Sequence, residues 1–232
     1  MSCLKISSYI FHYHILNTSI YTHTTVNRSM VMKSTAFLVL SVWLVVSMIV
    51  TTTASHQPAV LDTDGQPLQS GVEYYILPAV TDVSGGVTLF EGKNNCPLLV
   101  GQEPLGPEFS LGLPVTLEPF AEGETIIRED RDLTVTFQVF SICIQSTIWR
   151  VGEENPKTRR RPVVIAGERD YFRIQKNETG IYDIVWCPTE VCPICRFRCG
   201  SAGIVVENGN RLLALDGPAF PFQFTRVSNS AV

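Results

Sequence analysis

The 232-residue sequence contains only four histidines, and three of them (His12, His14 and His23) lie near its N-terminus. The fourth, His56, has no predicted core element nearby that could orient its imidazole. Catalytic triads and most general acid–base mechanisms depend on an oriented histidine. The scarcity of histidine therefore argues against an enzyme, and we expect no catalytic residue, cofactor or metal ion.

Other signatures of catalysis are also lacking. No glycine-rich loop that could cradle a phosphate opens a predicted helix. Neighbouring carboxylates do occur, and such pairs serve glycoside hydrolysis in some enzymes. The pairs are Glu122 with Glu124, Asp130 with Asp132, and Glu153 with Glu154. In an acidic surface protein we interpret them as solvated turns.

No apolar run comfortably reaches the roughly 20 residues that cross a bilayer as a helix. The longest, Ala36–Val50, follows Lys33 and ends at the small residues Thr52–Ala54. This order is typical of a secretory signal peptide, which we predict over residues 32–54, and a single signal anchor is the alternative. We interpret residues 1–31, which precede Met32, as a non-functional upstream extension.

The remaining region, residues 55–232, is acidic. It contains all 22 Asp and Glu residues but only 15 of the 18 Lys and Arg residues, which gives a net charge of about −7. Such a charge argues against nucleic acid or an anionic membrane as a partner. We expect a monomer that is secreted to the extracellular space (the apoplast in a plant) or delivered to the vacuole. The sequon at Asn177 is a candidate glycosylation site.

Six cysteines remain after removal of the N-terminal segments, and an even number in a secreted chain predicts a disulfide framework. Six cysteines allow 15 pairings, among which composition alone does not choose. The spacing C-x4-C-x2-C-x3-C near the C-terminus would also suit a zinc or iron–sulfur site, although secretion favours disulfides. The six are Cys96, Cys143, Cys187, Cys192, Cys195 and Cys199.

Helical periodicity is almost absent, whereas short runs with apolar residues at every second position recur between Gly, Pro and Asp-Gly turns. This pattern predicts an all-β domain over residues 55–232, either a sandwich or a barrel. The predicted strands are 74–77, 87–90, 133–137, 147–151, 171–174, 181–186, 204–206, 211–215 and 222–224. Aromatic strands around Tyr75, Phe137 and Tyr182 hint at a threefold repeat.

Residues 60–76 read VLDTDGQPLQSGVEYYI. This stretch resembles the N-terminal signature of the soybean-type Kunitz trypsin inhibitors of plants and their miraculin-like relatives. Further matches extend the resemblance over the whole region. They are Asn95-Cys96-Pro97, Gly112–Val115, Ser146-Thr147-x-Trp149, Val185–Pro188, Arg211-Leu212 and Pro221-Phe222-x-Phe224.

The resemblance implies a β-trefoil, in which twelve short strands form a pseudo-threefold barrel with a hairpin cap. It also implies three disulfides, namely Cys96–Cys143, Cys187–Cys199 and an inner Cys192–Cys195. Trefoil lectins usually carry a Gln-x-Trp motif, which is missing before Trp149 and Trp186. We therefore expect both tryptophans in the core.

Members of this family inhibit proteases through an extended, substrate-like loop, and the resemblance places that loop at Phe120, Ala121, Glu122, Gly123, Glu124 and Thr125. The position of the usual Arg or Lys holds Gly123, and Ser70 stands where an asparagine usually supports the loop. A trypsin-like S1 pocket carries a buried aspartate, which repels a carboxylate. The expected partner is an endopeptidase, with a serine endopeptidase other than trypsin as the first hypothesis.

Two alternatives remain open. The basic segment Lys157–Arg161, with Arg159, Arg160 and Arg161, could be a second reactive loop acting on cysteine or aspartic proteases, a processing site, or a solvated loop that balances nearby acids. Alternatively, the domain could be a non-inhibitory trefoil that binds another molecule or serves for storage.

Overall fold

The structure is a computed structural model, and it describes residues 57–80, 84–92, 96–104, 106, 110–141, 143 and 146–228. The predicted extension (1–31) and signal peptide (32–54) lie outside these residues, as do His56 and Asn95. The described residues belong to one compact unit, Gln57–Val232. Within them there is no helix long and apolar enough to cross a membrane.

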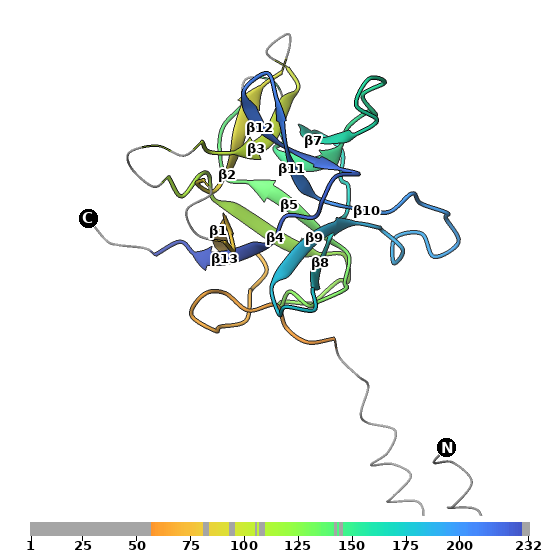
Figure 1. The fold of residues 1–232 in the computed structure, drawn as a ribbon. Helices are drawn as coiled ribbons and strands as arrows, with labels where there is room; N and C mark the ends of the chain where they lie inside the picture. The colour runs from red at the N-terminus through yellow and green to blue at the C-terminus, as the bar shows by residue number, and fades with distance from the viewer. Residues whose placement is uncertain are drawn as a thin grey trace, which may run out of the picture. The chain divides into compact units, whose positions relative to one another are not determined.

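The described residues form strands connected by turns and loops, without a helix. The strands, labelled in Figure 1, are β1 (Glu73–Pro78), β2 (Val87–Glu91), β3 (Leu98–Gln102), β4 (Val115–Pro119), β5 (Leu133–Phe137), β6 (Ile148–Val151), β7 (Arg161–Ala166), β8 (Arg173–Lys176), β9 (Tyr182–Trp186), β10 (Gly200–Ser201), β11 (Gly203–Glu207), β12 (Asn210–Leu215) and β13 (Phe222–Arg226). All nine strands expected from the sequence are present, and β3, β4, β7 and β10 are additional.

Six strands close into a barrel. β1 pairs with β13 and β4, β4 with β5, β8 with β9, and β9 with β13. A bridge between Leu133 of β5 and Phe172, which precedes β8, completes the ring. Because closure leaves no continuous open edge, the barrel offers few unpaired backbone groups to another chain.

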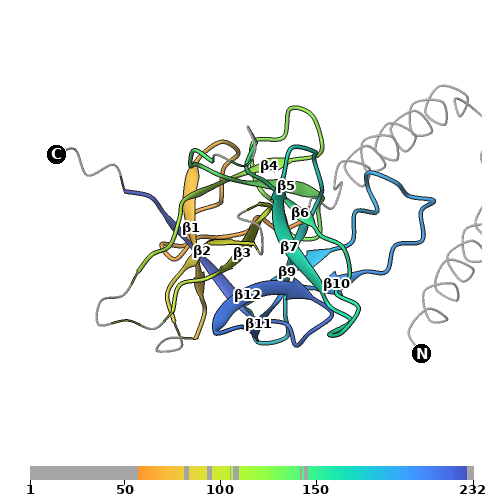
Figure 2. The same ribbon diagram turned by 90° about the horizontal axis from the view of Figure 1, so that it is seen from above.

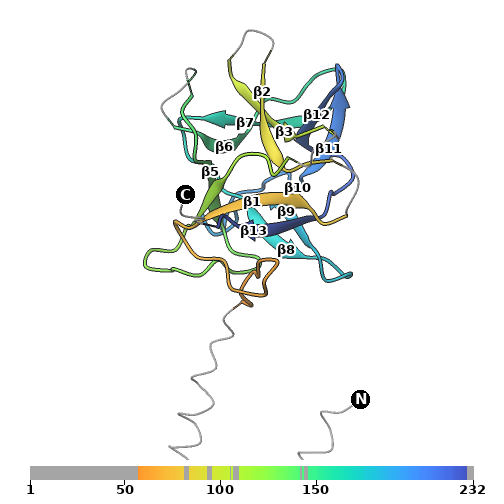
Figure 3. The same cartoon turned by 90° about the vertical axis from the view of Figure 1, so that its left-hand side faces the viewer.

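Three hairpins, β2–β3, β6–β7 and β11–β12, cap this barrel (Figures 2 and 3). Their inner strands pair with one another in a triangle, as Leu99 faces Val164, Ala214 faces Pro162 and Leu212 faces Gly101. In Figure 3 the hairpins occupy the upper half of the domain and β1, β8, β9 and β13 the lower half. A six-stranded barrel with three hairpins around a threefold centre is a β-trefoil, which confirms the predicted fold.

The strand count differs by one from the expected twelve because β10 and β11 are separated only by Ala202. β10 pairs with β9 of the barrel, whereas β11 pairs with β12 of the cap. The Ala202 amide donates to the Ile184 carbonyl, and the Ala202 carbonyl accepts from the Phe220 amide. One strand thus passes from barrel to cap and changes partners at Ala202.

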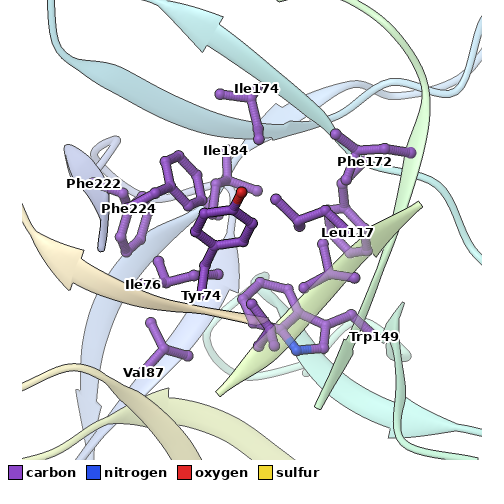
Figure 4. Packing of buried hydrophobic residues seen from close by; sticks show 14 of the residues in the cluster. Tyr74, Ile76, Val87, Leu117, Trp149, Phe172, Ile174, Ile184, Phe222 and Phe224 are labelled. Carbon is purple, nitrogen blue, oxygen red and sulfur yellow. The ribbon is translucent and has the colours of Figure 1, made fainter. Parts of the chain in front are cut away.

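Alternate residues of the barrel strands point inward and form one large apolar cluster (Figure 4). Trp149 is fully buried, with its ring 5.7 Å from that of Phe137 and 5.9 Å from that of Phe172. Trp186 is partly buried against the cluster, and its indole nitrogen donates to Asp170 at 2.8 Å. The structure therefore confirms Trp149 as a core residue and places Trp186 at the margin of the core.

All three expected disulfides are present. The Cα atoms are 5.6 Å apart in Cys96–Cys143, 4.7 Å in Cys187–Cys199 and 5.3 Å in Cys192–Cys195. The last two bridges use every cysteine of the C-terminal run, so these sulfur atoms are not thiolates that could bind zinc or an iron–sulfur cluster. The bridges close residues 187–199, here called the disulfide loop, which projects between β9 and β10 (Figure 1).

Candidate functional site

Residues Phe120–Thr125, here called the candidate loop, begin directly after β4. At its start, the Phe120 amide donates to the Asp132 carbonyl at 2.8 Å, and at its end the Thr125 carbonyl accepts from the Ser70 amide at 2.8 Å. The loop lies beside the N-terminal segment 57–72 at the open end of the barrel (Figures 1 and 3). Both of its ends are therefore fixed to the scaffold by backbone hydrogen bonds.

The apex of the candidate loop is a β-turn. The Glu124 amide donates to the Ala121 carbonyl at 3.4 Å, and Gly123 has a φ of +78°. Glycine at the third turn position with positive φ is the arrangement of a type II turn. The expected extended conformation is thus wrong for the segment from Ala121 to Glu124, because the glycine lets the chain reverse there. Glu122 and Gly123 are exposed at the tip.

The two acids of the loop have different surroundings. Glu124 is only 16% exposed and forms ion pairs with Arg128 (3.1 Å) and Arg131 (3.7 Å). Glu122 is exposed. The interpretation of this pair as a solvated turn is therefore wrong for Glu124, and Glu122 is the acid that is exposed at the tip of the loop.

The same correction applies to the other acidic pairs. Asp132 is buried, and its carboxylate accepts from Arg173 Nε at 2.5 Å and from the Glu190 and Val191 amides at 2.7 and 3.1 Å. Glu154 forms ion pairs with two arginines, described below. One member of each pair is therefore held by arginines. Some of these arginines are near in sequence, such as Arg128 beside Glu124, and others are distant, such as Arg173 beside Asp132.

Two further contacts shape the surroundings of the candidate loop. The ring of Phe120 meets that of Tyr171 edge to face at 5.3 Å, although Phe120 remains 40% exposed. Ser70 supports the loop only through its backbone, since its hydroxyl has no hydrogen-bond partner among the described residues. A partly exposed aromatic side chain thus adjoins the acidic tip.

The basic segment does not form one exposed basic loop. Arg161 is the first residue of β7, where its guanidinium makes two hydrogen bonds to Asp216, at 2.7 and 2.9 Å, and covers the Trp186 ring at 5.2 Å. Its hydrogen bond to Asp216 holds the pKa of that carboxyl below its ordinary value. The assignment of Arg161 to a reactive loop is therefore wrong, because the side chain is 11% exposed and fully engaged.

Arg159 and Arg160 lie in a tight loop in which the Asn155 amide donates to the Arg160 carbonyl and the Arg159 amide to the Asn155 carbonyl, both at 2.8 Å. Arg159 is 77% exposed, but it has a φ of +60° and pairs with Glu154 at 2.9 Å. A left-handed residue in a closed loop is not the extended strand that a protease cleft accepts.

Arg198 of the disulfide loop contacts the two acids that pair with Arg159 and Arg161. Nothing in the sequence indicated this role for Arg198. It contacts Glu154 at 2.5 Å and Asp216 at 2.9 Å. Its hydrogen bond to Glu154 raises the pKa of the Arg198 guanidinium. The separations of 44 and 18 residues follow no sequence pattern, so only the fold could reveal these contacts.

Asn177 occupies the turn between β8 and β9. Its side-chain oxygen accepts from the Thr179 amide (3.0 Å), the Thr179 hydroxyl (2.7 Å) and the Ile181 amide (3.1 Å). The sequon thus lies in a turn stabilised by its own side chains, with Glu178, Thr179 and Gly180 exposed.

Comparisons with known proteins agree with this fold. The family model of legume Kunitz inhibitors, described as "Trypsin and protease inhibitor", matches residues 60–226. Kunitz type trypsin inhibitor 111 of Medicago truncatula is 44% identical over 203 residues, which cover 83% of this chain and 96% of that protein. Miraculin of Synsepalum dulcificum is 33% identical over 185 residues, covering 72% and 83%.

Solved structures give the same result. Soybean trypsin inhibitor has a TM-score of 0.61 at 28% identity, with 73% of this chain and all of that chain covered. A Kunitz-type cysteine protease inhibitor from potato has a TM-score of 0.63 at 30% identity, with 75% and 99% covered. The N-terminal signature, the trefoil fold, the three disulfides and the matched relatives all indicate the same family. The chain belongs to the legume Kunitz family of protease inhibitors.

Proposed function

We propose that this protein inhibits a serine endopeptidase other than trypsin by binding it through the candidate loop. The observation that carries the proposal is the fixation of the loop before any partner binds. Its two ends are held by backbone hydrogen bonds from Phe120 and Ser70, and Glu124 is held by two arginines. A loop that is already ordered loses little conformational entropy when it enters a cleft, which favours tight binding.

The tip of the loop argues against trypsin as the target. The exposed side chain is the carboxylate of Glu122, and the adjacent Gly123 offers no side chain at all. A carboxylate placed near the buried aspartate of a trypsin-like pocket would be repelled, at a cost of several kcal/mol. A neutral or basic specificity pocket removes that repulsion, so we expect the target among endopeptidases with such a pocket.

The turn at the apex is compatible with this role if it opens on binding. It is closed by a single hydrogen bond of 3.4 Å, whose loss costs about 0.5–1.5 kcal/mol. The flanking anchors at Phe120 and Thr125 would remain in place during such an opening. Compared with an affinity of about 12 kcal/mol for a nanomolar inhibitor, this cost is small.

A non-inhibitory trefoil is the second candidate function, and Gly123 is the observation that favours it. Its left-handed φ departs from a substrate-like loop, and Ser70 does not supply a side-chain support. Inhibition of cysteine or aspartic proteases through the basic segment is a weaker candidate. Only the high exposure of Arg159 favours it, because Arg161 is engaged by Asp216.

The experiment is a titration of endopeptidases with the protein secreted from the full chain, so that the bridges form. The panel contains trypsin, chymotrypsin, elastase, subtilisin, a glutamate-specific serine endopeptidase, papain and an aspartic protease. We expect stoichiometric inhibition of at least one serine endopeptidase and weak or no inhibition of trypsin. Absence of inhibition at micromolar concentration across the panel would contradict the proposal and favour the non-inhibitory trefoil.

The same preparation tests two further proposals, namely secretion with removal of residues 32–54 and a glycan at Asn177. Secretion predicts an N-terminus near Ser55 in the mature protein. Glycosylation predicts a mass that decreases after treatment with an amidase specific for N-linked glycans and that is unaffected by the treatment in Asn177→Gln.

A further inference from the structure

We propose that Glu190, near the start of the disulfide loop, is a positioning residue for the candidate loop. The proposal rests on the proposed function, since it concerns how the same loop is held for binding. The disulfide loop would thereby take over part of the support that Ser70 does not give through its side chain. Glu190 lies 58 residues beyond Asp132 in sequence.

The contact between the two segments is reciprocal. The Glu190 carboxylate forms an ion pair with Arg131 and accepts the Asp132 amide at 2.9 Å. In return, the Asp132 carboxylate accepts the Glu190 and Val191 amides at 2.7 and 3.1 Å. Each acid thus satisfies backbone donors of the other segment, which fixes their separation and orientation.

This contact continues into the candidate loop by two routes. The Asp132 carbonyl accepts the Phe120 amide at 2.8 Å, which fixes the start of the loop. Arg131, paired with Glu190, also pairs with Glu124 at 3.7 Å. The disulfide loop is therefore connected to both the first residue of the candidate loop and the acid that follows its tip.

Glu190 itself is held in place by the fold. The Cys187–Cys199 and Cys192–Cys195 bridges close the loop around it, and the Cys192 amide donates to the Pro188 carbonyl at 3.3 Å. The Arg173 guanidinium spans Asp132 and the Thr189 hydroxyl, at 2.5 and 2.6 Å. An anchored carboxylate can orient Arg131, which at 29% exposure would otherwise sample several rotamers.

The test compares Glu190→Gln, Glu190→Ala and Arg131→Met with the control Glu153→Gln, an exposed glutamate with no ion pair among the described residues. Hydrogen exchange at the amides of residues 121–127 measures how well the candidate loop is held, whether or not a protease is bound. The inhibition constant for the most strongly inhibited endopeptidase of the panel measures the functional consequence. The free energy of global unfolding shows whether a variant keeps the stability of the fold.

We expect loop amides in Glu190→Ala to exchange about tenfold faster, which corresponds to about 1.4 kcal/mol of lost local protection. Glu190→Gln keeps an oxygen that can accept the Asp132 amide, so it should show a smaller increase in the exchange rate. Inhibition should weaken in the same order, with Glu153→Gln unchanged. Glu190 acts partly through Arg131, so the two substitutions should not be additive. The increase in the exchange rate in the double variant Glu190→Gln/Arg131→Met should be only slightly larger than the larger of the two single-variant increases.

The proposal is wrong if the loop amides exchange at the wild-type rate in folded Glu190→Ala, or if exchange rises equally throughout the barrel. If Glu190→Ala does not fold, Glu190→Gln and Arg131→Met decide by the same criteria. If exchange rises locally but the wild-type protein inhibits nothing in the panel, the positioning role stands and the proposed function fails. The two failures are therefore distinguishable.

Discussion

The Ser70 amide and the Thr125 carbonyl are joined by a hydrogen bond of 2.8 Å, which connects the N-terminal segment to the end of the candidate loop. The residue type at position 70 does not matter for this contact, because the donor belongs to the backbone. An asparagine there could add side-chain donors to the same support. The support by Ser70 is therefore weaker than the one that the family resemblance implies, but it is present.

This relationship predicts that Ser70→Ala leaves the candidate loop and its inhibition unchanged within about 0.5 kcal/mol, because only an unpartnered hydroxyl is removed. Ser70→Asn should strengthen inhibition severalfold by adding a side-chain support. The measurement is the inhibition constant for the endopeptidase that the wild type inhibits. A large loss in Ser70→Ala would mean that the hydroxyl contributes a contact that the free structure does not show.

Gly123→Ala should destabilise the protein by about 1 kcal/mol, because an alanine at a φ of +78° is strained. Steric overlap contributes nothing, since a Cβ there meets no atom within 4 Å. Gly167 is a matched control, because it is equally open but lacks the positive φ. Chemical denaturation should therefore show a loss for Gly123→Ala and no loss for Gly167→Ala. Equal effects would show that the turn conformation is not enforced.

The Arg161–Asp216 pair predicts a dependence on pH. The hydrogen bond from Arg161 lowers the pKa of Asp216 below 3.8, so the folded state binds this proton less readily than the unfolded chain. The contribution of the carboxylate is therefore complete above about pH 4 and is lost as the pH falls through the lowered pKa of the folded state.

We expect Asp216→Asn to lower the free energy of unfolding by about 1–3 kcal/mol at neutral pH. The difference from wild type should be constant between pH 5 and 8 and should shrink below pH 4. Glu168→Gln is the control, since Glu168 is 77% exposed in its pair with Arg150 and should contribute little. A difference that stays constant down to pH 2 would show that the Asp216 charge does not stabilise the fold.

The disulfides should differ in their contribution to stability. The Cys96–Cys143 bridge spans 47 residues and the Cys192–Cys195 bridge spans three. Chain-entropy arguments then give about 4 kcal/mol for the first and about 2 kcal/mol for the second. Paired Cys→Ser substitutions, followed by thermal and chemical denaturation, should reproduce this order. The reverse order would point to native-state contacts of the disulfide loop, such as those of Glu190, as the larger effect.

Much of the fold could be predicted from the sequence because most strands alternate apolar and polar residues and end at turn residues. β7 was not identified since it begins with Arg161-Pro162, a charged residue followed by one without an amide hydrogen. Proline is tolerated there because Pro162, which faces Ala214 of β12, takes part in pairing through its carbonyl, which accepts the Gly152 amide at 2.8 Å. The strand is defined by its neighbours in the cap more than by its own residue pattern.

The place of the candidate loop is a prediction from the family resemblance, whereas its conformation and its charge environment could not be predicted from the sequence. Gly123 indicated a missing basic side chain, whereas its additional role in reversing the chain depends on the positive φ. The pairing of Asp132 with Glu190 joins residues far apart in sequence. No spacing rule predicts such a contact. Asp132 therefore appears solvated in the sequence, although Arg173 holds its carboxylate in the structure.

The central claim is that the candidate loop enters the protease. The most direct test is to incubate the protein with the most strongly inhibited endopeptidase of the panel and to identify, by mass spectrometry, the bond that is slowly cleaved. We predict a single cleavage within Glu122–Thr125, with the two parts still held together by the anchors at Phe120 and Ser70. Cleavage after Arg159 or Arg160 would contradict this claim. So would strong inhibition in which the candidate loop is not cleaved and its amides gain no protection from hydrogen exchange in the complex.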